Sequence, residues 1–254
     1  NCWHFENVSS FSSREYIPCF LLEDRKAAVF TVVELETSAP WRFEVGGSAS
    51  SPKGRFYLSG GMENARYAQW RAVLNPGEAL EGAACSLLSV EGSLDEALNA
   101  LREHQQNALI HRSAADQTFP VIYNEWQNSF GHITEETVFD QLETLQRAGA
   151  EIYVIDSGWF CPKCDPNDTN YFGWWSRTGT WIPNRERFPN GIEAVTQAIR
   201  GKGMIPGIWC ELEAAGSESD CYHESSLLMT RGGKLVTSPD RRFLYFGSPG
   251  GRAY

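Results

Sequence analysis

The sequence predicts a chain in two parts, a β-sandwich followed by an α/β region whose strands run in parallel. Residues 1–90 contain short apolar runs separated by Gly, Pro, Ser and Asn, which is typical of antiparallel strands joined by turns. Across residues 121–213, three apolar runs alternate with two stretches of helical period. Alternating strands and helices favour a parallel sheet, whose carboxyl ends carry the functional residues. A functional site is therefore expected in the second part.

The composition indicates a globular protein with a sizeable core and an acidic surface. The chain has 254 residues, of which 42% are hydrophobic, and a formal net charge of −10. Nucleic acid is not an expected partner, because phosphate binding needs a basic surface. A membrane is not expected as a partner either, because the longest apolar run is far too short to span a bilayer.

The cysteines do not indicate a disulfide framework or a metal site. They number seven, an odd number, and are spread through the sequence. Cys161 and Cys164 have the spacing of a metal or redox pair, but no second pair follows, so an ordinary pair of loop thiols is the simpler interpretation. We expect no metal or cofactor, and a cytoplasmic location with secretion as the alternative.

The first part, residues 1–92, is expected to be a partial β-sandwich. It contains no cluster of catalytic residue types. Its strands are predicted at residues 16–22, 27–35, 41–45, 55–58, 67–74 and 83–90.

A helix within residues 93–119 is expected to link the two parts. Ser93 and Glu96 have the spacing of a capping box, which marks a helix start. The apolar residues that follow recur on one helical face over about five turns. They are Leu94, Ala97, Leu98, Leu101, Ala108 and Leu109. Residues 120–254 then form the second part.

The second part repeats a unit of strand and helix. Its strands are predicted at residues 121–126, 152–159 and 204–211. Between them, one helix is predicted to begin at Thr134, and another at Asn190 with Glu193 completing a capping box. The loop over residues 160–188 is far longer than is usual in such units, and loops of this length are usually functional.

Each predicted strand ends in Trp residues beside polar ones. Asp156 follows a buried apolar strand, so its carboxylate must face a polar ligand or partner at the strand end. We interpret it as an acceptor for sugar hydroxyls; the alternative is a carboxylate that caps a helix or fixes a loop. Trp126 and Trp209 end the first and third strands, where their rings could stack on a sugar or pack in the core.

Two carboxylates, Glu211 and Glu213, lie beyond Trp209 with alternate spacing. If the strand continues, all three side chains are expected on one side of it. Two carboxylates can act as acid and base in glycoside hydrolysis, but they must flank the scissile bond, and neighbours on one strand do not. We therefore assign Glu211 and Glu213 a binding or site-shaping role.

Three blocks of this region resemble the family 36 glycoside hydrolases, the bacterial α-galactosidase or melibiase group. They are residues 155–160, 187–192 and 202–213, which occur in the family's order. The resemblance implies a (β/α)8 TIM barrel, of which this chain would hold the first three βα units. It also implies retaining hydrolysis of terminal α-galactosides without a cofactor.

The resemblance assigns roles to individual residues. It implies that Trp126 stacks near the sugar, that Asp156 binds galactose hydroxyls, and that Trp209 lines the pocket. Arg241 matches a substrate-contacting Arg of the family. Ser157 stands where the family often has a second Asp, a departure that bears on hydroxyl recognition and on substrate preference. Secondary candidates for the site are Ser157, Trp159, Glu211 and Glu213.

The family's catalytic pair has no counterpart in this sequence. The nucleophile is expected in a Lys-x-Asp motif at the end of the fourth barrel strand, and the acid/base later still. Both are therefore expected beyond Tyr254, and the chain is expected to be a fragment that does not hydrolyse glycosides by itself.

Three alternatives remain open at this point. One is an α-N-acetylgalactosaminidase and another a galactosyl transferase, both of the same family. The third is a carbohydrate-binding protein without catalysis. The expected partner is an α-galactoside oligosaccharide or glycoconjugate, and the protein could also form a homo-oligomer.

Overall fold

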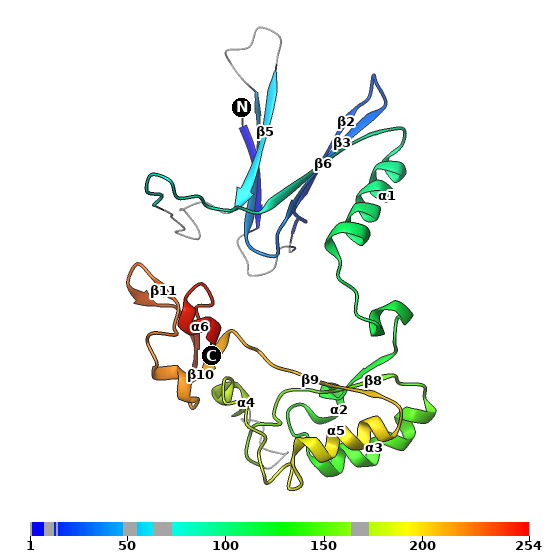
Figure 1. The fold of residues 1–254 in the computed structure, drawn as a ribbon, viewed down its shortest axis with the longest axis vertical. Helices are drawn as coiled ribbons and strands as arrows, with labels where there is room; N and C mark the ends of the chain where they lie inside the picture. The colour runs from blue at the N-terminus through cyan, green and yellow to red at the C-terminus, as the bar shows by residue number, and fades with distance from the viewer. Residues whose placement is uncertain are drawn as a thin grey trace. The chain divides into compact units, whose positions relative to one another are not determined.

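The computed structural model describes residues 2–7, 13, 15–47, 55–62, 73–163 and 173–253. The chain divides into two compact units, Asn1–His111 and Arg112–Tyr254 (Figure 1). The boundary falls inside the segment 93–119, for which the sequence predicts a linking helix. No helix among the described residues is both long and apolar enough to cross a membrane.

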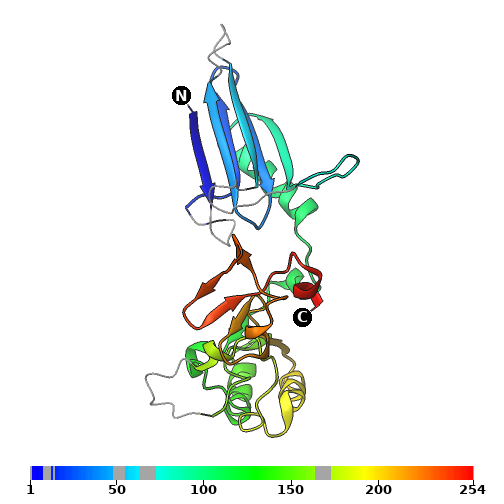
Figure 2. The same cartoon turned by 90° about the vertical axis from the view of Figure 1, so that its left-hand side faces the viewer.

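The first unit contains two antiparallel sheets of three strands each (Figure 2). Side chains from both sheets form one apolar core, in which Leu35, Trp41 and Phe43 are buried. The unit is therefore a sheet-rich region with a core between its sheets. One sheet has the order β1 (Cys2–Asn7), β4 (Trp41–Gly47), β5 (Phe56–Met62), and the other the order β2 (Cys19–Asp24), β3 (Val29–Glu36), β6 (Ala84–Glu91).

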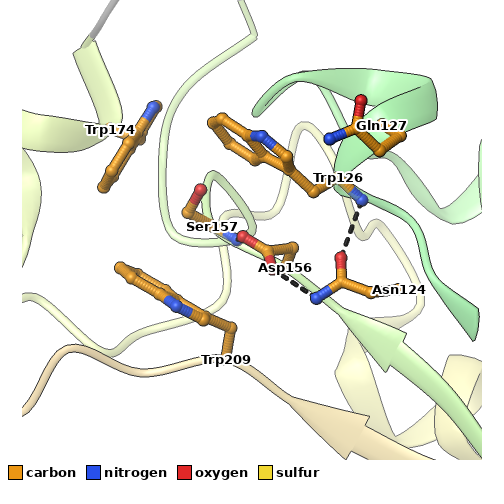
Figure 3. A pocket seen from close by; sticks show the side chains of 7 residues that line it. All are labelled: Asn124, Trp126, Gln127, Asp156, Ser157, Trp174 and Trp209. Atoms are coloured by element: carbon orange, nitrogen blue, oxygen red, sulfur yellow. Dashed lines mark hydrogen bonds between the residues drawn. The ribbon is translucent and has the colours of Figure 1, made fainter. Parts of the chain in front are cut away.

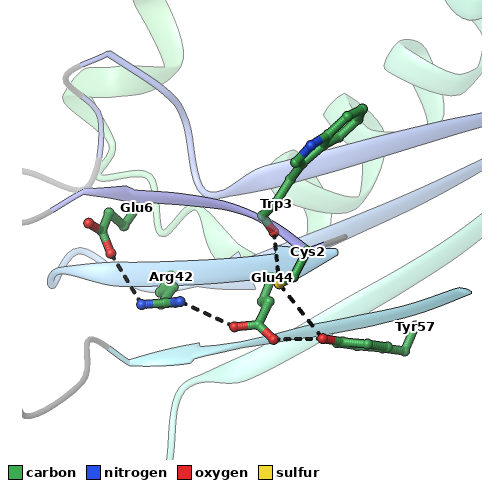
Figure 4. A network of polar contacts seen from close by, with 6 residues as sticks. All are labelled: Cys2, Trp3, Glu6, Arg42, Glu44 and Tyr57. Carbon is green, nitrogen blue, oxygen red and sulfur yellow. Dashed lines mark hydrogen bonds and ion pairs between the residues drawn. The ribbon is translucent and has the colours of Figure 1, made fainter. Parts of the chain in front are cut away.

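Two strand predictions differ from this arrangement. Strand β1 was not predicted, because its residues alternate too weakly between apolar and polar. It pairs antiparallel with β4, where Arg42 forms ion pairs with Glu6 on β1 and with Glu44 on its own strand (Figure 4). The predicted strand at 67–74 lies mostly outside the described residues, and residues 73–74 belong to no strand.

The capping box at Ser93 is present and starts helix α1 (Leu94–His104). Ala97 and Leu101 are buried in a core with residues of β3. Leu94 and Leu98 are each 47% exposed, so only part of the predicted apolar face is buried. Among the described residues, the helix packs on β3 and β6 of one sheet, and that contact covers only part of its apolar face. A π-type turn at Gln105–Leu109 and a 3-10 turn at Ala115–Thr118 follow.

The second unit contains a parallel sheet in the order β7 (Ile122–Asn124), β8 (Ile152–Ile155), β9 (Ile205–Ile208). Helices α3 (Glu135–Arg147) and α5 (Gly191–Gly201) connect its strands and lie side by side against it (Figure 1). The parallel strands that the alternating pattern predicts are thus present. The core between sheet and helices includes Val138, Leu142, Tyr153, Ile155, Val195 and Ile199.

One of the two predicted helix caps is present. The Thr134 hydroxyl accepts a hydrogen bond from the Thr137 backbone N–H at 3.1 Å and starts α3. The Asn190 side chain does not cap α5; instead its backbone N–H donates to the buried Glu135 carboxylate at 3.0 Å, and its amide donates to the same group. A carboxylate accepts more strongly than a neutral group, and here it ties the starts of α3 and α5 together.

The chain leaves the parallel sheet earlier than predicted. Strand β9 ends at Ile208, so the prediction of a strand as far as residue 211 is wrong at that end, and Trp209, Glu211 and Glu213 do not share one side of a continued strand. A small antiparallel sheet follows, in the order β10 (Ala214–Gly216), β14 (Arg241–Phe243), β13 (Thr237–Ser238). The remaining elements are α2 (Trp126–Ser129), α4 (Gly173–Arg177), a 3-10 turn at Asp220–His223, β11 (Thr230–Arg231), β12 (Lys234–Leu235) and α6 (Pro249–Ala253).

Candidate functional site

An open pocket of about 400 Å³ lies where the strands β7, β8 and β9 end. Its lining comes from all three strand ends and from the long loop after β8, so residues up to 85 positions apart in sequence meet there (Figure 3). The lining residues are Asn124, Trp126, Gln127, Asp156, Ser157, Trp174 and Trp209.

Three indole rings form the apolar walls of the pocket (Figure 3). Trp174, on α4, stands edge-on to Trp126 with the ring centroids 5.7 Å apart, and edge-on to Trp209 at 5.5 Å. Each ring therefore restrains its neighbour. Flat aromatic faces of this kind stack on the C–H faces of sugars.

The polar part of the pocket centres on Asp156, which is 8% exposed. Its Oδ2 accepts a hydrogen bond from the Asn124 amide at 2.7 Å, and its Oδ1 accepts one from the Ser157 backbone N–H at 2.7 Å. Asn124 Oδ1 in turn accepts from the Trp126 backbone N–H at 2.9 Å. The carboxylate is thus held in one orientation by the neighbouring strand, with remaining acceptor capacity for a ligand.

Ser157 also lines the pocket, and its hydroxyl has no hydrogen-bond partner among the described residues although it is buried. A buried hydroxyl without a partner is costly, which favours a polar ligand at this position. The next residue, Gly158, has φ of 99°, and a Cβ there would overlap the carbonyl group of Gly131. The tight turn that presents Asp156 and Ser157 therefore needs glycine.

Behind the pocket lies Glu125, which is fully buried. One of its oxygens accepts a hydrogen bond from the Asp156 backbone N–H at 3.1 Å, and the other accepts one from the Ser129 hydroxyl. Burial raises the pKa of Glu125 to about 7, and the nearby Asp156 charge adds to this rise. Sequence reasoning did not select Glu125, because its position at a strand end resembles that of any loop carboxylate.

The structure brings together Trp126, Asp156, Ser157 and Trp209 of the predicted site residues. Trp159 lies in the core instead, where its Nε1–H donates to the Trp209 carbonyl oxygen at 3.0 Å and supports that residue. Sequence reasoning missed Asn124, Gln127 and Trp174 as lining residues. The length of the loop 160–188 was the one available signal for Trp174.

The other predicted residues lie apart from the pocket lining. Arg241, on β14, forms an ion pair with Glu211, and its guanidinium lies 3.3 Å from the centre of the Trp175 ring. Glu213 is exposed. Trp175 contacts Trp174 with centroids 4.6 Å apart, so this group adjoins a pocket wall.

The described residues contain no group of three or more side chains arranged to hold a metal ion. Cys161 is buried, and Cys164, the other member of its predicted pair, lies outside the described residues. Among the described residues, the pocket lining contains polar and aromatic side chains and a single carboxylate, that of Asp156.

The sequence is similar to known α-galactosidases. AgaA of Geobacillus stearothermophilus is 24% identical over 152 residues, which cover 60% of this chain and 20% of that protein. Mel36A of Lactobacillus acidophilus is 24% identical over 196 residues, or 76% of this chain and 25% of that protein. The probable α-galactosidase C of Aspergillus flavus is 28% identical over 158 residues, which cover 59% of this chain and 20% of that protein. The chain thus spans a fifth to a quarter of the length of these relatives.

Solved structures of family 36 α-galactosidases share the fold. AgaB from Geobacillus stearothermophilus matches with a TM-score of 0.81 and 20% identity, covering 98% of this chain and 33% of that one. A variant of AgaA in complex with raffinose matches with a TM-score of 0.80 and 20% identity, covering 98% of this chain and 34% of that one. Another AgaA variant was solved with stachyose, with the same score and coverage.

A family model places the chain among these proteins. The Melibiase model matches residues 87–237, which is more than half of the chain and includes every residue that lines the pocket. The chain therefore belongs to the melibiase family.

Proposed function

We propose that this chain forms the galactose-holding wall of an α-galactosidase that hydrolyses terminal α-galactosides with retention of configuration. The observation that carries the proposal is the convergence of Trp126, Asp156 and Trp209 on one pocket. A sugar has an apolar C–H face and a ring of hydroxyls, and this pocket offers indole faces beside a fixed carboxylate.

The chemistry of the relatives supports galactose as the sugar. Raffinose and stachyose, bound in the AgaA structures, are oligosaccharides that end in an α-linked galactose. In our proposal the terminal galactose lies against the Trp rings, and its hydroxyls donate to Asp156 and contact Ser157.

Retaining hydrolysis needs two carboxyl groups about 5 to 5.5 Å apart, one as nucleophile and one as acid/base. Among the described residues, Asp156 is the single carboxylate in the pocket lining, and Asn124 holds it as a hydrogen-bond acceptor. We propose that the strands β7, β8 and β9 are the first three of a (β/α)8 barrel. The nucleophile and the acid/base would then lie on later strands.

Kinetics test this function on a protein that includes the proposed later strands. We expect release of nitrophenol from an aryl α-galactoside, and much slower release from its N-acetylgalactosaminyl analogue and from the β-anomer. The 254-residue chain alone is expected to release none. Equal turnover of the N-acetyl analogue would contradict the galactoside assignment, and turnover by the chain alone would contradict the missing catalytic pair.

A carbohydrate-binding protein without hydrolysis is the second candidate, because Asp156 is the one carboxylate that the described residues contribute to the lining. The coding sequence beyond Tyr254 distinguishes the two. An apolar strand followed by Lys-x-Asp supports the enzyme, whereas its absence together with retained galactoside binding supports the binding protein.

A further inference from the structure

Glu125 lies behind the pocket and contributes nothing to its lining, although its sequence neighbours Asn124 and Trp126 both do. We propose that Glu125 is a positioning residue, which holds Asp156 and Trp126 in the orientation that binds the sugar. The inference rests on the sugar-binding function proposed above and assigns a role to a residue that does not touch the sugar.

The contacts of Glu125 join the two sides of the pocket. Its carboxylate accepts the Asp156 backbone N–H at the end of β8 and the Ser129 hydroxyl on α2, the short helix that begins with Trp126. Its own backbone N–H donates to the Val154 carbonyl oxygen at 3.2 Å. One buried side chain thus fixes the position of the pocket's carboxylate relative to one of its indole walls.

The surroundings make this a costly place for a charge. Both groups that donate to the carboxylate are neutral, and Asp156 nearby carries the same sign. The charge of Arg187 favours ionisation of Glu125. However, the Arg187 guanidinium donates hydrogen bonds to the carbonyl oxygens of Gly131, Ile133 and Pro162. Tyr123 and Tyr153 pack nearby, and the Glu125 charge helps to raise the pKa of both phenols. A neutral side chain would suit the packing better, so stability alone does not explain a glutamate here.

The charge has a direct use at the pocket. An ionised carboxylate accepts the Asp156 N–H more strongly than a neutral acid does, and its negative charge makes the Asp156 carboxylate a better acceptor for hydroxyls. Protonation of Glu125 weakens both effects. Since burial raises the pKa of Glu125 to about 7, sugar affinity should increase as pH rises through neutrality. We expect roughly fivefold tighter binding at pH 8 than at pH 6.

The variant Glu125→Gln tests the proposal, because glutamine keeps the shape and an acceptor oxygen but cannot ionise. Raffinose affinity is measured by calorimetry at pH 6, 7 and 8, and the Asp156 amide signal is followed by ¹⁵N NMR without sugar. In the unsubstituted protein we expect the affinity to rise with pH, and the Asp156 amide signal to shift near pH 7 as the neighbouring Glu125 ionises. In Glu125→Gln neither the raffinose affinity nor the Asp156 amide signal should change between pH 6 and pH 8. The affinity should stay close to the value of the unsubstituted protein at pH 6. Glu143→Gln, an exposed glutamate on α3, is the matched control and should keep the original profile.

The outcomes separate this proposal from the proposed function. A Glu125→Gln variant that keeps the original pH profile, or binds as tightly as the unsubstituted protein at pH 8, overturns the positioning role. An Asp156 signal that titrates in a protein binding no raffinose at any pH refutes the sugar-binding function, and the positioning role with it. An Asp156 signal that does not titrate, in a protein that binds raffinose, refutes the role of Glu125 alone.

A second variant covers the case in which Glu125→Gln fails to fold. Ser129→Ala removes the hydrogen bond that lowers the pKa of Glu125. The midpoint of the pH-dependent change in the Asp156 amide signal, which reports the ionisation of Glu125, should therefore move to higher pH. An unchanged midpoint in a folded Ser129→Ala protein would overturn the proposal.

Discussion

Two polar networks in this molecule contain carboxylates, and they differ in what surrounds the charge. On the sheet β1-β4-β5, Arg42 lies between Glu6 and Glu44, and the Tyr57 hydroxyl donates to Glu44 at 2.8 Å (Figure 4). Behind the pocket, Glu125 and Asp156 are both buried, and the Asn124 amide, the Ser129 hydroxyl and two backbone N–H groups that donate to them are neutral.

The comparison shows that the two networks differ in what they cost the stability of the fold. Opposite charges that remain partly exposed interact weakly, because water and salt screen them. Two like charges in a buried site repel each other and lose hydration, so they destabilise the fold. A ligand that donates hydrogen bonds to them would offset part of this cost. The buried network is therefore the one that we connect with function.

The largest expected effect comes from Asp156→Asn. The change removes the charge that accepts from the sugar but preserves the size of the side chain. Two charge-assisted hydrogen bonds to hydroxyls would be weakened, so we expect raffinose affinity to fall by about 100-fold or more. Calorimetry measures this, with Asp140→Asn on the exposed side of α3 as the control. Near-normal affinity in Asp156→Asn would remove Asp156 from the site.

Glu125 should also make the stability of the protein depend on pH. Its pKa is raised from 4.5 to about 7 in the folded state, so folding favours the protonated form. That contribution is fully present below about pH 4.5 and is lost as pH rises through about 7. The loss is on the order of 3 kcal/mol. Denaturant unfolding of the unsubstituted protein and of Glu125→Gln at pH 5 and pH 8 measures it, and an equal pH dependence in both would contradict the assignment.

Trp126→Ala should reduce sugar affinity by about tenfold, because stacking on an aromatic face is lost while the hydrogen bonds remain. Trp3→Ala is the matched control, since Trp3 is 72% exposed on β1 and far from the pocket in sequence. An equal loss of affinity in both variants would show that the effect is not specific to the pocket.

The smallest expected effect comes from the exposed network. Arg42→Gln breaks ion pairs that are partly solvated, so we expect little change in melting temperature at 150 mM salt and none in raffinose affinity. Thermal unfolding at low and high salt measures this. A large drop in melting temperature would contradict this, because it would mean that the partly exposed ion pairs of Arg42 stabilise the fold strongly.

Much of the second unit could be predicted from local sequence, because its signals are local. Alternating apolar runs and helical periods predict the parallel order β7-β8-β9, and Thr134 predicts the start of α3. Asp156 was selected because a carboxylate after a buried strand needs a polar neighbour, and the Trp residues because rings at strand ends can stack on a ligand.

The remaining features depend on contacts between distant residues. Asn190 stands at the N-cap position of α5, but its side chain does not cap the helix because Glu135, 55 residues away in sequence, accepts its hydrogen bonds. Trp174 becomes a pocket wall through its contacts with Trp126 and Trp209, which its own neighbours in sequence do not indicate. Glu125 differs from an ordinary loop carboxylate only through its complete burial in the folded chain.

The central claim is that the pocket binds a terminal α-galactosyl group. Raffinose and sucrose provide a direct test, because the two sugars differ by that group alone. With three indole rings in the pocket, tryptophan fluorescence should report binding. We predict a saturable fluorescence change with raffinose, none with sucrose, and none with raffinose in Asp156→Asn. The same response to both sugars, or no response to raffinose, would contradict the account.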